Sequence, residues 1–205
     1  MVLKTEALNN FADVACGSHK FAKRLGKIVG GENAHKGEFP WLVSITRRGG
    51  HFCGGTVINN RFIMTAAHCL CTGIGPEILQ PNSLKVTMSQ HDLTQKNADA
   101  YQMSIKDVRV HPGYTCNKPK DDIAILELDN ELKWSETVLP ACLPVAASHG
   151  QYSKFDNVLA TVAGWGWTSE DKSKDLGSNH RGRSSEFKKP NCVLVMNKEE
   201  SMLVG

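Results

Sequence analysis

Two short stretches decide how this sequence is interpreted: TAAHC at residues 65–69 and DDIAIL at residues 121–126. The first places a histidine at the end of an apolar, strand-like run, where a histidine taken alone is most often simply packed or exposed. The second places an acid at the head of a run typical of a buried strand. A buried carboxylate needs a hydrogen-bonding partner to offset its desolvation, and an imidazole N–H is a suitable one. We therefore predict that His68 and Asp122 lie together, with Asp121 as the solvated neighbour.

Short β-type runs surround these two stretches. They are rich in β-branched residues and are separated by Gly, Asn and Pro turn signals. The predicted strands are 41–46, 51–58, 61–67, 84–89, 101–110 and 122–128. Six strands at this spacing favour an all-β barrel or sandwich. A proline-marked connection at 139–144 leads to one more strand-like run at 158–167, and beyond it only 193–196 is apolar enough for a strand.

The composition excludes several classes of protein. The 205 residues include 24 Lys+Arg and 21 Asp+Glu, and 40% are apolar, as expected of a globular chain rather than a disordered one. The longest weakly polar run, 158–168, is too short for a membrane span, which needs about 20 apolar residues. The basic segment 181–189 contains one aromatic residue, Phe187, and the net charge of +3 is small. We therefore expect neither a membrane span nor a nucleic-acid partner.

The seven cysteines point to an oxidising compartment. Their spacing matches no zinc motif, so disulfides are the favoured interpretation, and disulfides indicate an extracellular or secreted protein. The N-terminus has a Lys and a Glu where a signal peptide would have an uninterrupted apolar stretch. We expect the true signal to lie upstream of Met1; the alternative is a cytosolic protein with free thiols. The odd number of cysteines suggests that one partner is missing.

Together, seven motifs resemble the chymotrypsin-like serine endopeptidases, and they occur in the order typical of that family. The matching pieces are KIVGG at 27–31, FPW at 39–41, CGGT at 53–56, TAAHC at 65–69, DIAIL at 122–126, ACLP at 141–144 and AGWG at 163–166. The resemblance implies an all-β, chymotrypsin-like double β-barrel, with the first barrel complete and the second truncated.

By this resemblance, His68 is the general base and Asp122 its orienting carboxylate. They are 54 residues apart, against roughly 45 in the family template, and a loop at 72–83 fits the extra length. The Lys27–Ile28 bond resembles an activation site cut by an upstream protease. In the family, the freed ammonium of the residue matching Ile28 then pairs with an aspartate beside the nucleophile.

The resemblance also suggests how the cysteines pair. The implied bridges are Cys53 with Cys69, Cys16 with Cys142, and Cys71 with Cys116 as an extra bridge spanning the His68 and Asp122 loops. Cys192 is then left over, and free buried thiols are the alternative to some of these bridges.

The family's nucleophile segment, Gly-Asp-Ser-Gly-Gly, does not occur in the 205 residues. It would follow the aspartate by roughly 90 residues, beyond Gly205. We expect a leader or propeptide-like segment at 1–27 and a protease domain at 28–205. This domain divides into a first barrel at 28–140, the connection and start of a second barrel at 141–168, and a divergent tail at 169–205. The strand at 158–167 is then expected to leave its backbone unpaired.

The leading hypothesis is a secreted, trypsin-like serine endopeptidase domain that acts on proteins or peptides. It requires no cofactor and no metal, and it is inactive as written because the nucleophile segment is absent. The alternative is a non-catalytic secreted homologue that acts as a binding or regulatory protein. A third possibility is a small cytosolic β domain with free thiols. The residues that would distinguish trypsin-like from chymotrypsin-like cleavage preference lie in the missing stretch.

Overall fold

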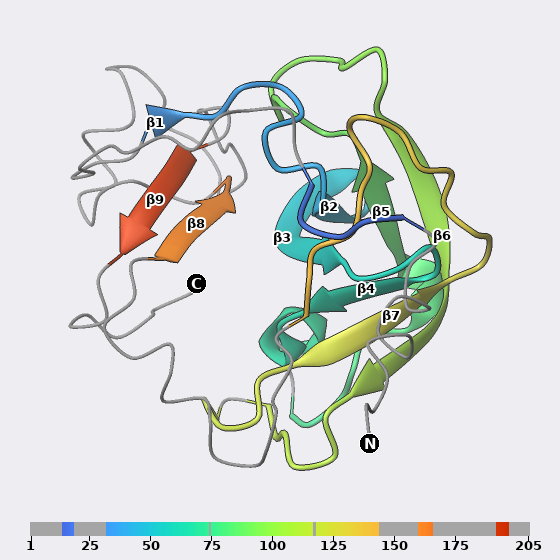
Figure 1. The fold of residues 1–205 in the computed structure, drawn as a ribbon. Coiled ribbons are helices and arrows are strands. Elements are labelled where there is room, and N and C mark those ends of the chain that lie inside the picture. The colour runs from blue at the N-terminus through green and yellow to red at the C-terminus, as the bar shows by residue number, and fades with distance from the viewer. Residues whose placement is uncertain are drawn as a thin grey trace, which may run out of the picture.

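A computed structural model describes residues 14–18, 32–73, 75–116, 118–143 and 160–165 and the strand 192–196 (Figure 1). For 32–33, 160–161 and 192–196 it describes the backbone. These residues form strands and two 3-10 helices, η1 (Ala67–Leu70) and η2 (Pro81–Ser83), and the described part of the chain has no α-helix. The prediction of an all-β fold is therefore confirmed. Within the described ranges, no helix is long and apolar enough to cross a membrane.

Six strands form a closed antiparallel barrel. They are β2 (Leu42–Arg47), β3 (Gly50–Val57), β4 (Phe62–Thr65), β5 (Leu84–Met88), β6 (Tyr101–Val110) and β7 (Ala124–Leu128). The strand order is β2-β3-β4-β7-β6-β5, and β5 pairs back onto β2 to close the barrel (Figure 1). Closure leaves no open sheet edge. Each of these strands corresponds to one of the six runs predicted from the sequence.

Two strand ends of the barrel differ from the prediction by two residues, both at the candidate site, and the others differ by at most one. The run 61–67 was expected to be strand throughout, but β4 ends at Thr65 because η1 begins at Ala67. The run 122–128 enters its strand only at Ala124. Before it, Asp121 has a positive φ of 59° and its carbonyl accepts the N–H of Ile123 at 2.8 Å. Asp122 therefore lies in a tight turn beside the barrel rather than within the strand.

Local interactions explain the two hairpin turns before the site, through backbone conformation in the first and a side-chain hydrogen bond acceptor in the second. Between β2 and β3, Arg48 and Gly49 have φ values of 51° and 82°, as a two-residue turn of type I′ requires. Between β3 and β4, the side-chain oxygen of Asn59 accepts the N–H groups of Arg61 and Phe62, at 2.8 and 2.7 Å. Such Asx turns fix the direction in which the next strand leaves.

The barrel encloses one apolar core. Alternate residues of the strands point inwards, so that side chains from all six strands meet. The most deeply buried members, each 2% exposed or less, are Val43, Ile45, Val57, Ile63, Leu84, Val86, Met88, Ala124, Leu126, Leu128 and Val138, joined by Ala67 and Leu70 of η1. The helical turn that carries His68 is therefore anchored in the core on both sides of the histidine.

A second, three-stranded sheet lies outside the barrel. It contains β1 (Glu32–Asn33), β8 (Ala160–Gly164) and β9 (Cys192–Met196) in the order β1-β9-β8. The expectation that the strand at 158–167 would leave its backbone unpaired was wrong for one edge of β8, which is an edge strand of this sheet. The five residues of β8 pair antiparallel with β9, from Ala160 opposite Met196 to Gly164 opposite Cys192. The apolar run 193–196 supplies the partner, because any extended segment of matching length can complete the ladder of hydrogen bonds.

Candidate active site

The pairing of β4 with β7 brings the two halves of the site together. Its last rung joins Thr65 to Ala124. His68 follows Thr65 by three residues, and Asp122 precedes Ala124 by two. In an antiparallel pair, the segment leaving one strand and the segment entering the other emerge at the same end. Residues that are 54 positions apart in the chain therefore meet at one rim of the barrel.

His68 and Asp122 are joined by two hydrogen bonds. The backbone N–H of His68 donates to Oδ1 of Asp122 at 2.7 Å, and ring atom Nδ1 donates to Oδ2 at 2.7 Å. A carboxylate accepts but does not donate, so Nδ1 carries the ring proton and the neutral ring keeps a lone pair on Nε2. The two side chains are 33% and 28% exposed, which leaves the ring accessible from solvent. This is the geometry of a general base held by an orienting carboxylate.

The carboxylate of Asp122 is held in its charged form. Burial acts to raise the pKa of Asp122, but the side-chain and backbone hydrogen bonds from His68 act in the opposite direction. A hydrogen bond from the backbone of Ala67 reinforces them, as does the positive charge of the His68 ring when the ring is protonated, so that the pKa of Asp122 lies below its usual value of 3.8. An ionised Asp122 favours the imidazolium that forms when Nε2 takes a proton.

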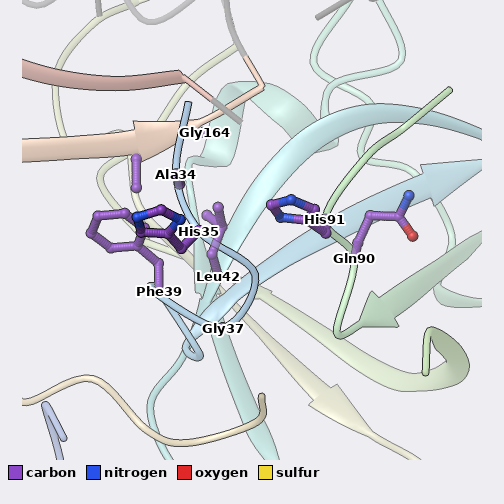
Figure 2. Close-up of a pocket in the computed structure, with 9 residues that line it drawn as sticks. Ala34, His35, Gly37, Phe39, Leu42, Gln90, His91 and Gly164 are labelled. Atoms are coloured by element: carbon purple, nitrogen blue, oxygen red, sulfur yellow. The ribbon is translucent and has the colours of Figure 1, made fainter. Parts of the chain in front are cut away.

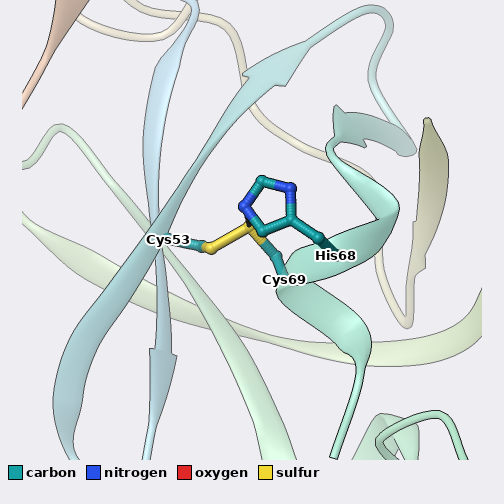
Figure 3. A group of neighbouring side chains, drawn as sticks. All are labelled: Cys53, His68 and Cys69. Carbon is teal, nitrogen blue, oxygen red and sulfur yellow. Dashed lines mark hydrogen bonds between the residues drawn. A yellow bond between two sulfur atoms is a disulfide. The ribbon is translucent and has the colours of Figure 1, made fainter. Parts of the chain in front are cut away.

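A disulfide lies against the other ring nitrogen. Cys53 of β3 is bonded to Cys69, the residue after His68, and Sγ of Cys69 is 3.6 Å from Nε2 (Figure 3). The ligand atoms of Cys53, His68 and Cys69 all lie within 4.8 Å of one another. They do not form a metal centre, because metals bind cysteine as thiolate and these two sulfurs are bonded to each other. The bridge instead ties η1 to β3.

Two further disulfides match the pairs that the resemblance implied. Cys71 is bonded to Cys116, and Cys16 is bonded to Cys142 across 126 residues of sequence. Next to the latter, the N–H of Gly17 donates to the carbonyl of Pro140 at 2.8 Å. The segment 14–18 is thereby attached to the connection that follows the barrel. The side chain of Cys192, and Lys27 and Ile28 of the predicted activation site, lie outside the described residues.

A serine–histidine contact elsewhere in the barrel was not predicted from the sequence. Ser44 of β2 lies 2.7 Å, Oγ to Nδ1, from His51 of β3. The ring of His51 packs edge-on against Trp165, with 5.3 Å between the ring centroids. Burial lowers the pKa of His51 from 6.5 to about 4, so the ring is neutral at pH 7. Ser44 is only 1% exposed, which excludes attack on a peptide carbonyl. The contact is therefore structural and is not a second catalytic pair.

Trp165 connects the barrel to the second sheet. It is 3% exposed, and its indole N–H donates to the carbonyl of His91 at 3.0 Å. A small pocket lies nearby, lined by residues between 34 and 42, by Gln90 and His91, and by the end of β8 (Figure 2). His68 and Asp122 do not line it. The candidate active site is therefore the rim that carries these two residues.

A closed six-stranded antiparallel barrel with a histidine–aspartate pair at its rim defines a trypsin-like serine protease domain. The chain belongs to the trypsin family, whose model matches residues 28–189. Over 174 residues, 81% of the chain, it is 32% identical to ovochymase-2 of Mus musculus. It is 34% identical over 160 residues to transmembrane protease serine 9 of Rattus norvegicus, and 29% identical over 161 residues to mannan-binding lectin serine protease 1 of the same species.

These relatives are much longer proteins. The matched region covers 27% of the ovochymase, 14% of the transmembrane protease and 22% of the lectin-associated protease. It covers 78% and 74% of this chain in the latter two comparisons. The chain therefore spans about a quarter or less of the curated relatives that it matches, and the shared part is the protease domain.

Proposed function

We propose that the domain serves in peptide-bond hydrolysis, with His68 as the general base and Asp122 as its orienting carboxylate. The observation that carries the proposal is the 2.7 Å contact from Nδ1 of His68 to Asp122, which leaves the lone pair on Nε2. The substrates are proteins or peptides, the substrate class of a serine endopeptidase. The three disulfides support an extracellular setting, since such bonds persist in oxidising compartments.

The chemistry is a two-step acyl transfer. Nε2 of His68 removes the proton from a serine hydroxyl while the serine oxygen attacks the peptide carbonyl. The C–N bond then breaks, and the imidazolium returns the proton to the leaving amine. Water repeats the sequence on the acyl-enzyme and releases the acid. In both steps the negative charge of Asp122 stabilises the imidazolium, and its hydrogen bond fixes the orientation of the ring.

The proposed reaction requires a serine nucleophile in addition to His68 and Asp122. No Gly-Asp-Ser-Gly-Gly sequence occurs in the 205 residues. The buried Ser44 does not replace it. We therefore infer that the 205 residues alone supply the base and its orienting acid but form no acyl-enzyme.

The proposed activation step is cleavage after Lys27 by a protease that recognises basic residues. Ile28 would then become a new N-terminus, as in other members of the family. The Cys16–Cys142 bridge joins a residue before this bond to one after the barrel, so the leader should stay attached after cleavage. On electrophoresis, the cleaved chain should separate into two fragments only when reductant is added. Release of the leader without reductant would contradict this tether.

A second candidate function is that of a non-catalytic homologue that binds partners through its surface. Retention of both His68 and Asp122 favours the enzyme instead.

Two experiments distinguish these functions. Sequencing the complete transcript shows whether the reading frame contains a Gly-Asp-Ser-Gly-Gly segment. A fluorophosphonate probe applied to the natural protein after cleavage at Lys27 should label a serine, and the His68→Ala variant should lose most of that labelling. Absence of labelling in a correctly cleaved protein would favour the binding protein. Labelling of the 205-residue chain would refute our inference that it lacks a nucleophile.

A further inference from the structure

The Cys71–Cys116 disulfide begins directly beside His68. Cys71 ends η1, and its backbone N–H donates to the carbonyl of His68 at 3.2 Å. Cys71 also forms an isolated bridge with Ile78, and the N–H of Leu79 donates to the carbonyl of Leu70 at 2.7 Å. The first sulfur is therefore held by a well-bonded segment that continues from the histidine.

The other end of the disulfide lies in the loop that leads into Asp122. Cys116 is buried, with 9% exposure. The loop closes beside the aspartate, because the N–H of His111 donates to the carbonyl of Ile123 at 3.0 Å. The tight turn at Asp121 then directs the chain into β7. The second sulfur is thus attached to a loop whose closing hydrogen bond lies one residue from Asp122.

Tyr114 lies against the Cys71 end of the bridge. Its hydroxyl lies 3.6 Å from Sγ of Cys71. A disulfide sulfur has no proton to give, so the hydroxyl is the donor in this contact. Burial, and after it the negative charge of Asp122, raises the pKa of Tyr114. The ring also packs against the barrel core.

The β4–β7 ladder and the Cys53–Cys69 bridge do not join the segment that carries His68 to the loop that carries Asp122, whereas the Cys71–Cys116 bridge does. The β4–β7 ladder fixes the chain up to Thr65 and from Ala124 onwards. It does not fix the segment after Thr65, which carries His68, or the segment before Ala124, which carries Asp122. The Cys53–Cys69 bridge fastens η1 to β3, on the histidine side alone. Of the three disulfides among the described residues, only Cys71–Cys116 joins the segment that carries the histidine to the loop that carries the aspartate.

We propose that the Cys71–Cys116 disulfide, with Tyr114 packed against it, is a positioning clamp that holds the ring of His68 on the carboxylate of Asp122. The clamp rests on the proposed function, since its purpose is to keep Nε2 of His68 oriented towards the catalytic serine. Displacement of a reacting group by about 1 Å can cost on the order of 100-fold in rate. We assign its residues a positioning role, exerted through the His68–Asp122 pair.

The test uses the Nδ1 proton of His68 in the 205-residue chain, which requires no nucleophile. Long-range ¹H–¹⁵N NMR reports which ring nitrogen is protonated, and the His68→Gln variant assigns the signal. In the unmodified chain we expect the Nδ1–H tautomer with a slowly exchanging proton. In Cys71→Ser/Cys116→Ser we expect both tautomers and about tenfold faster exchange with water, the effect of weakening one hydrogen bond. The matched control, Cys16→Ser/Cys142→Ser, removes a disulfide elsewhere and should leave the signal unchanged.

Each outcome either supports or refutes the proposed clamp. If the folded Cys71/Cys116 variant keeps a single tautomer and its slow exchange, the clamp is refuted. If the control variant changes the signal equally, the bridge acts only on general stability and the clamp is likewise refuted. Should the first variant fail to fold, Tyr114→Phe with the disulfide intact takes its place. Faster exchange there supports the clamp, and unchanged exchange overturns it. Failure of fluorophosphonate labelling would remove the proposed function but leave this result standing.

Discussion

The carboxylate of Asp122 accepts two hydrogen bonds from one residue, His68: one from the backbone N–H and one from the ring, each 2.7 Å long. The backbone contact fixes where η1 begins relative to β7, and the ring contact fixes the tautomer. A single side chain therefore combines a structural with a chemical role, and the two can be separated by mutation.

Asp122→Asn should reverse the tautomer of His68. An amide N–H in place of Oδ2 needs a lone pair on Nδ1, so the ring proton moves to Nε2 and the base is lost. The amide oxygen can still accept the backbone N–H, so the free energy of unfolding should fall by only about 1 kcal/mol. Long-range ¹H–¹⁵N NMR and urea unfolding measure the two effects. The control Asp121→Asn alters the neighbouring carboxylate and should leave the tautomer of His68 unchanged.

Acidification should destabilise the fold through His51. The unfolded chain binds a proton to this ring below its usual pKa of 6.5, whereas in the fold burial delays binding until about pH 4. Between these values the unfolded state holds more protons, so the free energy of unfolding falls as the pH is lowered from 6.5 to 4. We expect a loss on the order of 1–2 kcal/mol, because the ring is partly screened by solvent.

Urea unfolding at pH 7 and at pH 4.5 measures this loss. His51→Gln removes the titrating group, and its stability should change less over the same interval. An equal pH dependence in the variant and the unmodified chain would show that other groups are responsible.

Gly55 and Gly54 should differ in their tolerance of alanine. A Cβ on Gly55 would lie 2.9 Å from Ile63 Cγ2, 3.1 Å from Val43 Cγ2 and 3.3 Å from the carbonyl of Met64, inside the packed barrel. Gly55→Ala should therefore cost about 1–3 kcal/mol, as overpacked cores do. A Cβ on the adjacent Gly54 meets nothing within 4 Å, so Gly54→Ala should stay within about 0.5 kcal/mol. Thermal and urea unfolding of both variants provide the comparison, and equal losses would contradict it.

Lys106 and Arg109 should act cooperatively on Glu127. The carboxylate is 8% exposed and accepts Lys106 Nζ at 2.6 Å on one oxygen and Arg109 Nη2 at 2.8 Å on the other. Either cation alone can compensate the buried charge, so Lys106→Met and Arg109→Met should each be mild. The double variant should lose more stability than the two single losses combined, because it leaves the carboxylate unpaired. The same cycle in a Glu127→Gln background should show weaker coupling, and undiminished coupling there would count against the explanation.

The sequence by itself determined the strand runs and the choice of His68 and Asp122 as the candidate pair. The alternation of apolar and polar side chains and the positions of turn residues are local properties of the sequence. They can therefore be recognised without knowledge of the tertiary structure. The family resemblance added the pairing of the cysteines, which spacing alone does not settle. The ends of β4 and β7 were predicted less well, because a helical turn and an Asp turn there depend on hydrogen bonds between segments 54 residues apart.

Only the tertiary structure decided the contacts that need the barrel to close. The Ser44–His51–Trp165 cluster unites two strands with a segment more than 100 residues later, and no local pattern marks it. Glu127 is also buried by its neighbours, although glutamate is usually exposed, since two basic side chains of β6 cover it. Likewise, the pairing of β8 with β9 depends on which extended segment reaches its edge. Local patterns set which residues can be buried, whereas closure of the chain in space sets which of them meet.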